Sequence, residues 1–365
     1  MKKITVLVDI YYLKAAVAGI GSYIREFEAS SSDHGSDDIN YVFSHDINKL
    51  VGNSVFLNSN NRIIRWIFQI RYLIYKQVKL PLKILFSKAD YVICPDYVAP
   101  LITFNAKRIT VLHDSLFWDQ KNNYSVLWRK YFITLINLGM NSKTQIVTTS
   151  NYSKNNLIKI FGNNRTINFV YQSFNFHKTT SSNYKTPENY LLHIGSFEKR
   201  KDLITLVKAF KLVKDDSLKL VLAGAQIING SSEVLDEIKT FIFQNKLENK
   251  VILAGYVSKA EASILYKNAS LYVFPSLDEG FGIPILEALS FSLPVICSDI
   301  DIFKEVGGDC VEYFKVGDSI SLSKKIISVL DSDKLRQNDN TKHINKFSRK
   351  NFIKGFERII LDTND

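Results

Sequence analysis

Cysteine and proline are scarce in this sequence. Its three cysteines, Cys94, Cys297 and Cys310, are an odd number and lack the close spacing of metal ligands. They argue against a disulfide framework and a zinc site, and they favour a reducing compartment. The 7 prolines and 16 glycines are too few for a collagen-like or disordered chain, and 46% of the residues are hydrophobic, as expected of a globular protein.

Long apolar runs are also absent. No uncharged apolar stretch of about eighteen residues occurs, so no segment is expected to span a bilayer. The first residues, MKKITVLVDI, contain a short apolar run without a small-residue cleavage site, and we interpret them as a β-strand and not as a signal peptide. We therefore expect a cytoplasmic protein, or one that lies on the inner face of the cell membrane.

The chain of 365 residues is longer than one hydrophobic core usually supports, which favours two domains. Short β-rich runs alternate with longer amphipathic segments, and apolar strands joined by crossover helices form parallel sheets covered on both faces. The sequence therefore predicts an α/β fold of two Rossmann-like doubly wound domains. It also predicts a polar linker at 177–190 and a terminal amphipathic helix at 347–362. The predicted strands are 4–10, 41–44, 91–95, 109–114, 145–150, 190–196, 218–224, 250–256, 271–276 and 294–299.

Ligands of such domains bind beyond the carboxyl ends of the strands, and the segment SLDEGFGIPILE (276–287) follows one predicted strand directly. Gly280 and Gly282 allow the backbone to approach a ligand closely, and Pro284 suits the first turn of a helix. The N-terminus of such a helix binds an anion such as a phosphate.

Two glutamates in the same segment need a different partner. Glu279 and Glu287 only accept hydrogen bonds when ionised, so they require hydroxyl donors. A nucleoside diphosphate sugar presents a phosphate flanked by two hydroxyl-rich rings and would satisfy all of these groups. The plainer alternative is an Asp-Glu-Gly turn in which Glu287 caps its own helix.

A second loop, GSFEKRKD (195–202), places Lys199, Arg200 and Lys201 at the start of a predicted helix. The helix dipole disfavours cations there, so this placement indicates an anionic partner. Arg200 and Lys201 are suited to neutralising a diphosphate. A solvated basic turn is the alternative.

A third loop, AGIGSYIREF (18–27), contains a glycine turn. It lacks the third glycine of a dinucleotide fingerprint, and no acid near position 40 ends a second strand as a dehydrogenase would require. We expect Gly19 and Gly21 to let main-chain N–H groups approach a phosphate instead.

Together these segments resemble the retaining glycosyltransferases of family 4, which have the GT-B fold. Glu279 and Glu287 enclose GFGIP and are followed by EAL, PVICSDI and KEVGGD, as in the donor-binding region of that family. GSFEKRKDL resembles the family's phosphate loop, AGIGSYIRE its glycine loop, ITVLHDSLF its histidine loop, and TTSNYSKNNLIKIFG the segment before the interdomain crossing. Ser22 stands where many members have arginine, and QSFN (172–175) replaces an asparagine-glycine turn.

The resemblance implies an organisation and an activity. An acceptor-side domain would cover 1–178 and a nucleotide-sugar domain 179–346, with a C-terminal helix in 347–365 that crosses back to the first. The implied reaction moves a hexose to a saccharide acceptor on a lipid diphosphate carrier, in the synthesis of a bacterial surface polysaccharide such as O-antigen or capsule. Overall similarity favours mannose and GDP-mannose, with UDP- and dTDP-sugars as alternatives.

The resemblance also implies roles for individual residues. Arg200 and Lys201 would hold the diphosphate, Glu279 the sugar hydroxyls and Glu287 the ribose hydroxyls. His113 would lie beside the sugar on the acceptor side and complete a catalytic set with Arg200, Lys201 and Glu279. The remaining predicted contacts are Gly19, Gly21, Gly280, Phe281, Gly282 and Ile283 to the donor, and Ser22 and Asp114 on the acceptor side.

Neither a metal nor another cofactor is expected. Asp299 and Asp301 spell the D-x-D that holds a divalent cation in other glycosyltransferases, but this loop binds no metal in the resembled family. The leaving diphosphate would take the proton of the acceptor hydroxyl, so no dedicated protein base is required.

The segment 62–88 contains seven basic residues and no acidic residue. On a helical wheel Arg62, Arg65, Lys76 and Lys79 fall within an arc of about 100°, across from a broad apolar face. Such a helix is suited to an anionic membrane surface. A buried helix with a solvated basic edge is an equal alternative.

The sequence leaves other functions open. The net charge of +11 suits nucleic acid, anionic lipid or a phosphorylated small molecule, although the acidic residues of the loops argue against nucleic acid. A nucleotide-sugar 2-epimerase or a phosphorylase shares the two-domain plan, but the phosphorylase needs a pyridoxal lysine motif that is not found. A non-catalytic sugar-nucleotide-binding subunit would keep the same donor loops.

Overall fold

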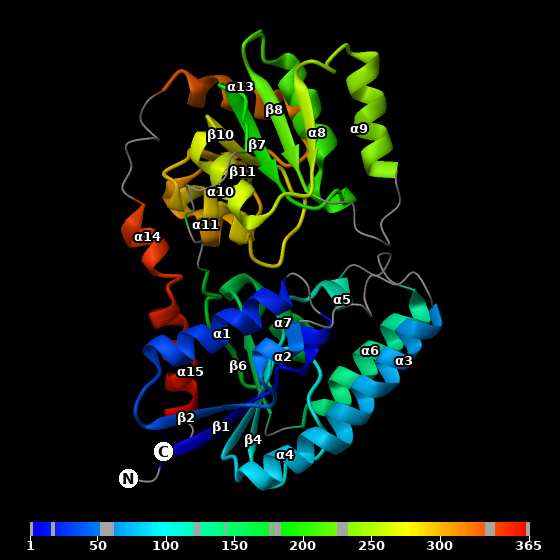
Figure 1. The fold of residues 1–365 in the computed structure, drawn as a ribbon, viewed down its shortest axis with the longest axis vertical. Helices are drawn as coiled ribbons and strands as arrows, with labels where there is room; N and C mark the ends of the chain where they lie inside the picture. The colour runs from blue at the N-terminus through cyan, green and yellow to red at the C-terminus, as the bar shows by residue number, and fades with distance from the viewer. Residues whose placement is uncertain are drawn as a thin grey trace. The chain divides into compact units, whose positions relative to one another are not determined.

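The structure is a computed structural model, shown as a ribbon in Figure 1. It describes residues 3–15, 19–51, 62–119, 125–141, 144–174, 178, 184–224, 233–332 and 340–362. The chain divides into two compact units, Met1–Asn175 with Phe347–Asp365, and Phe176–Lys346. Of the predicted linker, residues 177 and 179–183 lie outside the described part.

The first unit is built on a six-stranded parallel sheet in the order β2-β1-β3-β4-β5-β6. All five strands predicted for this half are present. The sixth, β6, was missed because its three residues are too few to show a period. The strands are β1 (Ile4–Val8), β2 (Ile39–Phe43), β3 (Tyr91–Cys94), β4 (Lys107–Val111), β5 (Gln145–Thr148) and β6 (Ile167–Phe169).

Helices cover this sheet and include the last segment of the chain. The helices are η1 (Tyr11–Lys14), α1 (Ile20–His34), α2 (Ile47–Val51), α3 (Arg62–Ile74), the π-helical η3 (Tyr75–Lys79), α4 (Leu80–Ser87), α5 (Leu116–Asp119), α6 (Val126–Gly139), α7 (Asn151–Phe161) and α15 (Arg349–Leu361). Within the described ranges, no helix has the length and apolarity needed to cross a membrane.

The helix α15 packs beside α1, as Figure 1 shows in red and blue. Phe352 and Phe356 of α15 share a buried core with Phe27 of α1, and their rings meet edge to face. Gly355 lies against β6, where an added Cβ would come within 2.6 Å of Val170 Cγ1. The helix is therefore an integral part of the first unit's core.

The segment 62–88 forms α3, η3 and α4, and the prediction of its solvent-facing side is wrong in one respect. Lys76 was expected on an exposed basic arc, but its side chain is completely buried between Asp9 and Asp96. The side chains of Arg62 and Arg65, expected on the same arc, lie outside the described part. Because the Lys76 charge is satisfied inside the unit, the helix presents a different face to solvent.

The second unit repeats the architecture, with a parallel sheet in the order β12-β11-β10-β7-β8-β9. All five predicted strands are present, and only the three-residue β12 was missed. The strands are β7 (Tyr190–Ile194), β8 (Lys219–Ala223), β9 (Val251–Gly255), β10 (Leu271–Phe274), β11 (Val295–Ser298) and β12 (Glu312–Phe314). The helices are η5 (Lys199–Lys201), α8 (Leu203–Leu212), α9 (Glu233–Gln244), α10 (Lys259–Asn268), α11 (Ile283–Ser290), α12 (Asp301–Gly307), η6 (Gly308–Cys310), α13 (Ser319–Leu330) and α14 (Thr341–Asn345).

The strand order changes direction at a corresponding place in both sheets. In the first unit β1 pairs with β3 as well as β2, and in the second β7 pairs with both β8 and β10. The loops that follow neighbouring strands at such a switch point diverge to opposite faces and leave room for a ligand. The predicted α/β, doubly wound fold is confirmed, and its switch points locate the sites.

Candidate active site

The two loops that carry the predicted donor residues of the second unit follow β7 and β10. These strands are neighbours at the switch point, although the loops are far apart in sequence. The loop after β7 leads into η5 and α8, and the loop after β10 leads into α11. A main-chain hydrogen bond of 2.7 Å from Leu277 N to Arg200 O joins the loops. The basic loop and the acidic loop therefore form one site.

Glu279 is the centre of this site. Its carboxylate forms an ion pair with Lys201 and accepts a hydrogen bond of 2.8 Å from Arg200 Nη1. Ser276 Oγ donates a third hydrogen bond of 3.1 Å to Oε1. Arg200 is oriented in turn by Glu198, whose Oε2 lies 2.8 Å from Arg200 Nε. The site brings together Glu279, Arg200 and Lys201, which the sequence had assigned to different parts of one ligand.

The charged groups of this cluster shift one another's pKa values. Burial by itself raises the pKa of the Glu279 carboxyl, but Lys201 and Arg200 outweigh it and hold that pKa below its ordinary value. Burial lowers the pKa of the Lys201 ammonium, and the Glu279 carboxylate opposes this shift only in part. Burial also lowers the pKa of the Arg200 guanidinium, but Glu279 and Glu198 reverse the shift, and the pKa is raised. Glu279 is therefore ionised and held rigidly at neutral pH.

Glu287 lies within α11 and has a different environment. Tyr266 Oη of α10 donates a hydrogen bond of 2.9 Å to Glu287 Oε2. Burial raises the pKa of the Glu287 carboxyl, and the Tyr266 hydroxyl counteracts that shift. The carboxylate therefore accepts a hydrogen bond from a side chain of the same unit and does not cap its own helix; its contact with a ribose stays a prediction.

The N-terminus of α11 supplies main-chain donors to the same site. Gly282 is the N-cap with φ of 104°, a left-handed conformation that favours glycine. It has no side-chain cap, and Pro284 lies in the first turn, as the sequence predicted. Phe281 is buried, and Phe303 approaches Gly282 so closely that an added Cβ would lie 3.0 Å from its ring. First-turn N–H groups without a side-chain cap are suited to binding an anion at the end of the β-strands.

Three further glycines line the carboxyl ends of the neighbouring strands. Gly195, Gly224 and Gly255 follow or end β7, β8 and β9. Gly224 N donates to Gly255 O at 2.7 Å, and Gly195 N donates to Ala223 O at 2.9 Å. A Cβ on Gly224 would lie 1.8 Å from the carbonyl oxygen of Gly195. Only glycine permits this approach of the two main-chain segments.

His193 lies in β7 and is fully buried. Its Nδ1 donates to the carbonyl of Val273 at 3.0 Å, and burial lowers the pKa of the imidazole to about 4. Its Nε2 has no hydrogen-bond partner among the described residues and faces Gly195. This histidine is therefore neutral at pH 7 and has a structural role.

The predicted acceptor-side residues lie in the first unit, after β1 and β4. His113 Nε2 donates to Pro95 O at 2.7 Å, and its ring meets Tyr23 edge to face. Burial lowers the pKa of His113 to about 4, so its imidazole is neutral at pH 7. Asp114 accepts a hydrogen bond of 3.1 Å from Tyr97 Oη.

The glycine loop leads directly into α1. Gly19 is the N-cap of α1 with φ of 56°, Gly21 is buried in the first turn, and Ser22 is exposed. The turn again presents uncapped main-chain donors, since Gly19 has no side chain.

The sequence analysis missed a buried ionic cluster at the switch point of the first sheet. Lys76 Nζ lies 2.6 Å from Asp9 Oδ2 and 2.5 Å from Asp96 Oδ1. Tyr75 Oη donates to Asp9 and Tyr72 Oη to Asp96, at 2.9 and 2.8 Å. A signal was present, since each acid lies within two residues of the end of a buried strand. Their shared partner, Lys76, comes from a helix that precedes Asp96 by 20 residues.

The side chains of the D-x-D pair, Asp299 and Asp301, lie at or just before the start of α12 and contact the main chain and solvent. Asp299 Oδ1 accepts a hydrogen bond of 3.1 Å from Val316 N, and Asp301 begins α12 with an exposed side chain.

Comparison with known proteins assigns the second unit to a family. Residues 177–345 match the family described as Glycosyl transferases group 1. This unit is a group 1 glycosyltransferase domain. The resemblance proposed from the sequence is thereby confirmed for the part of the chain that holds Glu279, Glu287, Arg200 and Lys201.

Two curated relatives of the chain are named as O-antigen chain mannosyltransferases. The chain is 32% identical over 183 residues to the O-antigen chain mannosyltransferase RfbU of Salmonella typhimurium, covering 50% of each protein. It is 26% identical over 251 residues to the O-antigen chain mannosyltransferase B of Escherichia coli, covering 63% of each. The matched regions thus span between half and two thirds of these relatives.

A solved structure extends the likeness of fold to the whole chain. Anabaena Alr3699/HepE, crystallised in complex with UDP and glucose, has a TM-score of 0.70 and 15% sequence identity, and the match covers 99% of this chain and 100% of HepE. At this identity the likeness concerns the fold alone. It confirms the predicted GT-B fold.

Proposed function

We propose that the chain is a retaining, metal-independent glycosyltransferase that moves a hexose from a nucleoside diphosphate sugar to a saccharide acceptor. The observation that carries the proposal is the ionised Glu279, held between Lys201, Arg200 and Ser276 at the start of α11. Cations and uncapped N–H groups suit a diphosphate, and the carboxylates suit ring hydroxyls.

In the proposed reaction the bond between the anomeric carbon and the diphosphate oxygen breaks as the acceptor hydroxyl attacks from the same face. The leaving diphosphate gains negative charge and takes the hydroxyl proton. Arg200, Lys201 and the N–H groups of α11 stabilise the developing charge, an effect that is strongest in a preorganised site. Glu279 accepts hydrogen bonds from the sugar, and Glu287 from the ribose.

The main-chain groups of Gly280, Phe281, Gly282 and Ile283 are proposed to contact the sugar and phosphates. In the first unit, Gly19 and Gly21 are proposed donor contacts, and His113, Asp114 and Ser22 are proposed to serve the acceptor. Neutral His113, whose Nε2 is committed to Pro95, would then position its neighbours and leave the acceptor proton to the phosphate.

The proposed donor is GDP-mannose, and the proposed acceptor is a saccharide on a lipid diphosphate carrier. The names of RfbU and the E. coli mannosyltransferase support mannose and O-antigen, whereas the HepE complex contains UDP and glucose. An enzyme with a lipid-linked acceptor works at a membrane surface, and 62–88 is the proposed contact at the inner face of the cell membrane.

Calorimetric titration of the full chain with GDP-mannose, UDP-glucose, GDP and UDP tests the donor site. We expect binding that Glu287→Ala weakens by about tenfold or more, because a buried hydrogen-bonded carboxylate is removed. Glu312→Ala, which removes a partly exposed glutamate paired with Lys325 in the same unit, is the matched control and should bind like the native protein.

Absence of nucleotide binding, or equal losses in both variants, would refute the donor site. Transfer of labelled mannose from GDP-mannose to a lipid extract from polysaccharide-producing bacteria then tests the activity, with nuclear magnetic resonance of the product reporting the anomeric configuration. Nucleotide binding without transfer to any extract would instead indicate a non-catalytic binding subunit.

A further inference from the structure

A line of large apolar side chains faces solvent along α3, η3 and α4, and we call it the apolar stripe. At its two ends, Trp66 is 69% exposed and Phe86 is 79% exposed. Single exposed apolar residues are ordinary, but a continuous row of them marks an interaction surface. The members of the stripe are Trp66, Ile67, Ile70, Ile74, Val78, Leu82, Leu85 and Phe86.

The π-helical turn keeps this stripe on one side. Most members are spaced by four residues, and in an α-helix each such step advances by about 40° around the axis. Over the whole stripe this drift would carry the row to the opposite side. The turn η3 at Tyr75–Lys79 accommodates one more residue per turn, and this rotates the row back between Ile74 and Val78.

The opposite face of the same helices is anchored by charge. Lys76, from the π turn, is buried between Asp9 and Asp96, which follow β1 and β3. Turning the stripe inward would break both ion pairs and leave two buried carboxylates without their cation, which is strongly destabilising. The apolar row is therefore held outward by the fold and is not a misplaced core face.

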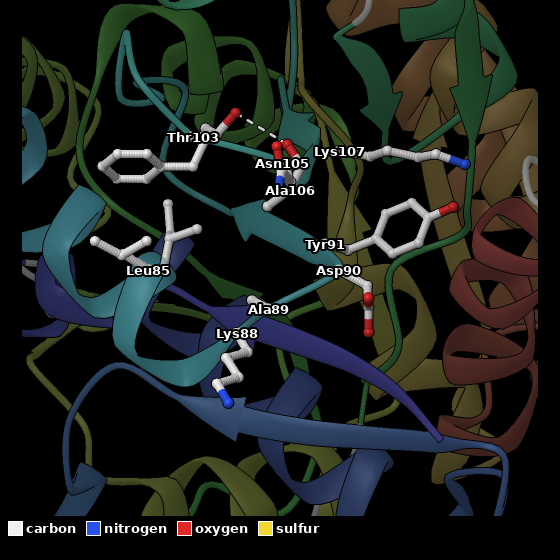
Figure 2. Close-up of a pocket in the computed structure, with 11 residues that line it drawn as sticks. Leu85, Lys88, Ala89, Asp90, Tyr91, Thr103, Asn105, Ala106 and Lys107 are labelled. Atoms are coloured by element: carbon white, nitrogen blue, oxygen red, sulfur yellow. Dashed lines mark hydrogen bonds between the residues drawn. The ribbon is translucent and has the colours of Figure 1, made fainter. Parts of the chain in front are cut away.

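A second segment widens the surface. Leu101, Ile102 and Phe104 are each more than half exposed, and Leu101 N donates a hydrogen bond of 3.0 Å to Gln77 Oε1 of η3. A cavity of about 360 Å³ separates the end of α4 from the loop that contains Phe104. Figure 2 shows Leu85 on one side of this cavity and Thr103 and Asn105 on the other.

The charged residues within the segment 62–88 are all positive. Arg71, Lys79 and Lys88 are exposed, and the segment 62–88 contains no aspartate or glutamate. An apolar row flanked by cations, with a tryptophan at one end, is the pattern of a helix that lies in the headgroup region of an anionic bilayer. A row of about 20 residues is about 30 Å long, enough to lie along a bilayer surface.

We propose that the apolar stripe, with Leu101, Ile102 and Phe104 beside it, is a docking surface for a bilayer that contains anionic phospholipid. Trp66 and the isoleucines enter the boundary between headgroups and acyl chains, and Arg71 and Lys79 contact lipid phosphates. The inference deepens the proposed function, on which it rests only for the lipid-linked acceptor.

Vesicle co-sedimentation of the full chain tests this surface without any sugar nucleotide. The vesicles contain phosphatidylglycerol and phosphatidylethanolamine, or phosphatidylcholine alone. We expect binding to the anionic vesicles that weakens as salt is raised, and weaker binding to the neutral ones. The combined variant W66S/I70S/I74S should lose about tenfold or more in affinity, and R71E/K79E should lose its preference for anionic vesicles.

Two matched controls lie elsewhere on the chain. F243S/I320S removes two exposed apolar side chains of the second unit, and K350E/K354E reverses two exposed charges of α15. Both should bind vesicles like the native protein. Circular dichroism and nucleotide titration of every variant separate loss of docking from loss of fold or of the donor site.

Three results would overturn the proposal. The first is an intact protein that does not sediment with anionic vesicles at low salt, and the second is an equal loss in the control variants. The third is a dimer, detected by light scattering, that W66S/I70S/I74S converts to a monomer, which would assign the stripe to a second copy of the chain. None of these results bears on nucleotide binding, so failure of the docking surface is distinguishable from failure of the proposed function.

Discussion

Lys201 and Glu279, 78 residues apart in the sequence, form a buried ion pair between the loops that follow β7 and β10. The pair exists because these two strands are neighbours in the sheet. Each partner is less than 10% exposed, so solvent screens their interaction little. Removing either partner would therefore leave a buried charge without compensation from the other.

Replacing Lys201 with methionine should destabilise the protein by about 3 kcal/mol, because a buried carboxylate loses one of its two cations. The double variant K201M/E279Q should recover much of that loss, since no unpaired charge remains. Neither variant should transfer sugar. Urea unfolding and transfer assays measure the two effects.

The exposed pair of Lys325 and Glu312 provides the control for this experiment. Their side chains are about a third exposed, so Lys325→Met should cost at most about 1 kcal/mol. A double variant K201M/E279Q that is as unstable as K201M alone would contradict the assignment of the cost to the unpaired Glu279.

Replacing Tyr266 with phenylalanine should weaken nucleotide binding by about threefold to tenfold, because Glu287 loses the hydroxyl that holds it. The same change should raise the pKa of Glu287 further, since this hydrogen bond lowers it. The pH below which nucleotide binding is lost should therefore rise. Calorimetric titration at several pH values measures both effects.

Tyr190→Phe is the matched control for Tyr266. Tyr190 is also buried, and its hydroxyl bonds the main chain of α10 at Leu265 O, 2.7 Å away, without contacting Glu287. Both variants should lose about 1 kcal/mol of stability. If Tyr190→Phe weakens nucleotide binding as much as Tyr266→Phe, the effect is general and Glu287 is not its cause.

The buried His193 should make the protein less stable in acid. Its pKa is lowered to about 4 in the fold, whereas an unfolded chain protonates histidine near pH 6.5. Below about pH 6.5 the unfolded state binds more protons, so stability falls as the pH is lowered towards 4. Up to about 3 kcal/mol is lost over this range, at 1.36 kcal/mol for each pKa unit.

His193→Asn should remove the His193 share of this pH dependence, because asparagine keeps an N–H for Val273 O and does not titrate. The share of His113, whose pKa burial also lowers to about 4, should remain. Urea unfolding between pH 7 and 4 measures the slope. His34→Asn, which alters a histidine in an exposed position at the end of α1, should leave the slope unchanged. A native-like slope in His193→Asn would show that another group causes the acid sensitivity.

Gly355→Leu should destabilise the first unit by about 2 kcal/mol or more, since even a Cβ would come 2.6 Å from Val170. The neighbouring Lys354 is exposed, so Lys354→Leu should change stability by less than about 0.5 kcal/mol. Thermal unfolding monitored by circular dichroism compares the two. Val170→Ala combined with Gly355→Ala should be more stable than Gly355→Ala alone if the contact is the cause.

Much of the fold was readable from local patterns. The apolar runs that form ten strands, the first-turn Pro284 of α11 and the final amphipathic helix depend on residues close together in the sequence. The short strands β6 and β12 were missed because three residues carry too little periodicity. Their pairing partners, and not their own composition, make them strands.

The chemistry of the donor loops was also present in the sequence, because a phosphate-binding helix start needs glycine and proline at particular positions and a hydroxyl-rich ligand needs acids. The residues that Glu279 and Glu287 contact could not be predicted from the sequence. Ser276 contacts Glu279 within the same loop, but Tyr266 and Lys201 come from other elements, and the tertiary fold brings those elements to the two glutamates.

The position of Lys76 was also not predictable from the sequence. By sequence it belongs to a basic, amphipathic helix, and a helical wheel places it with Lys79 on the outside. The tertiary structure buries it instead, because Asp9 and Asp96 end neighbouring strands and together supply two carboxylates for one ammonium. The sequence determined that a helix with cations and large apolar residues forms here. The side that faces solvent was decided by the tertiary structure, because Lys76 pairs with Asp9, 67 residues before it, and with Asp96, 20 residues after it.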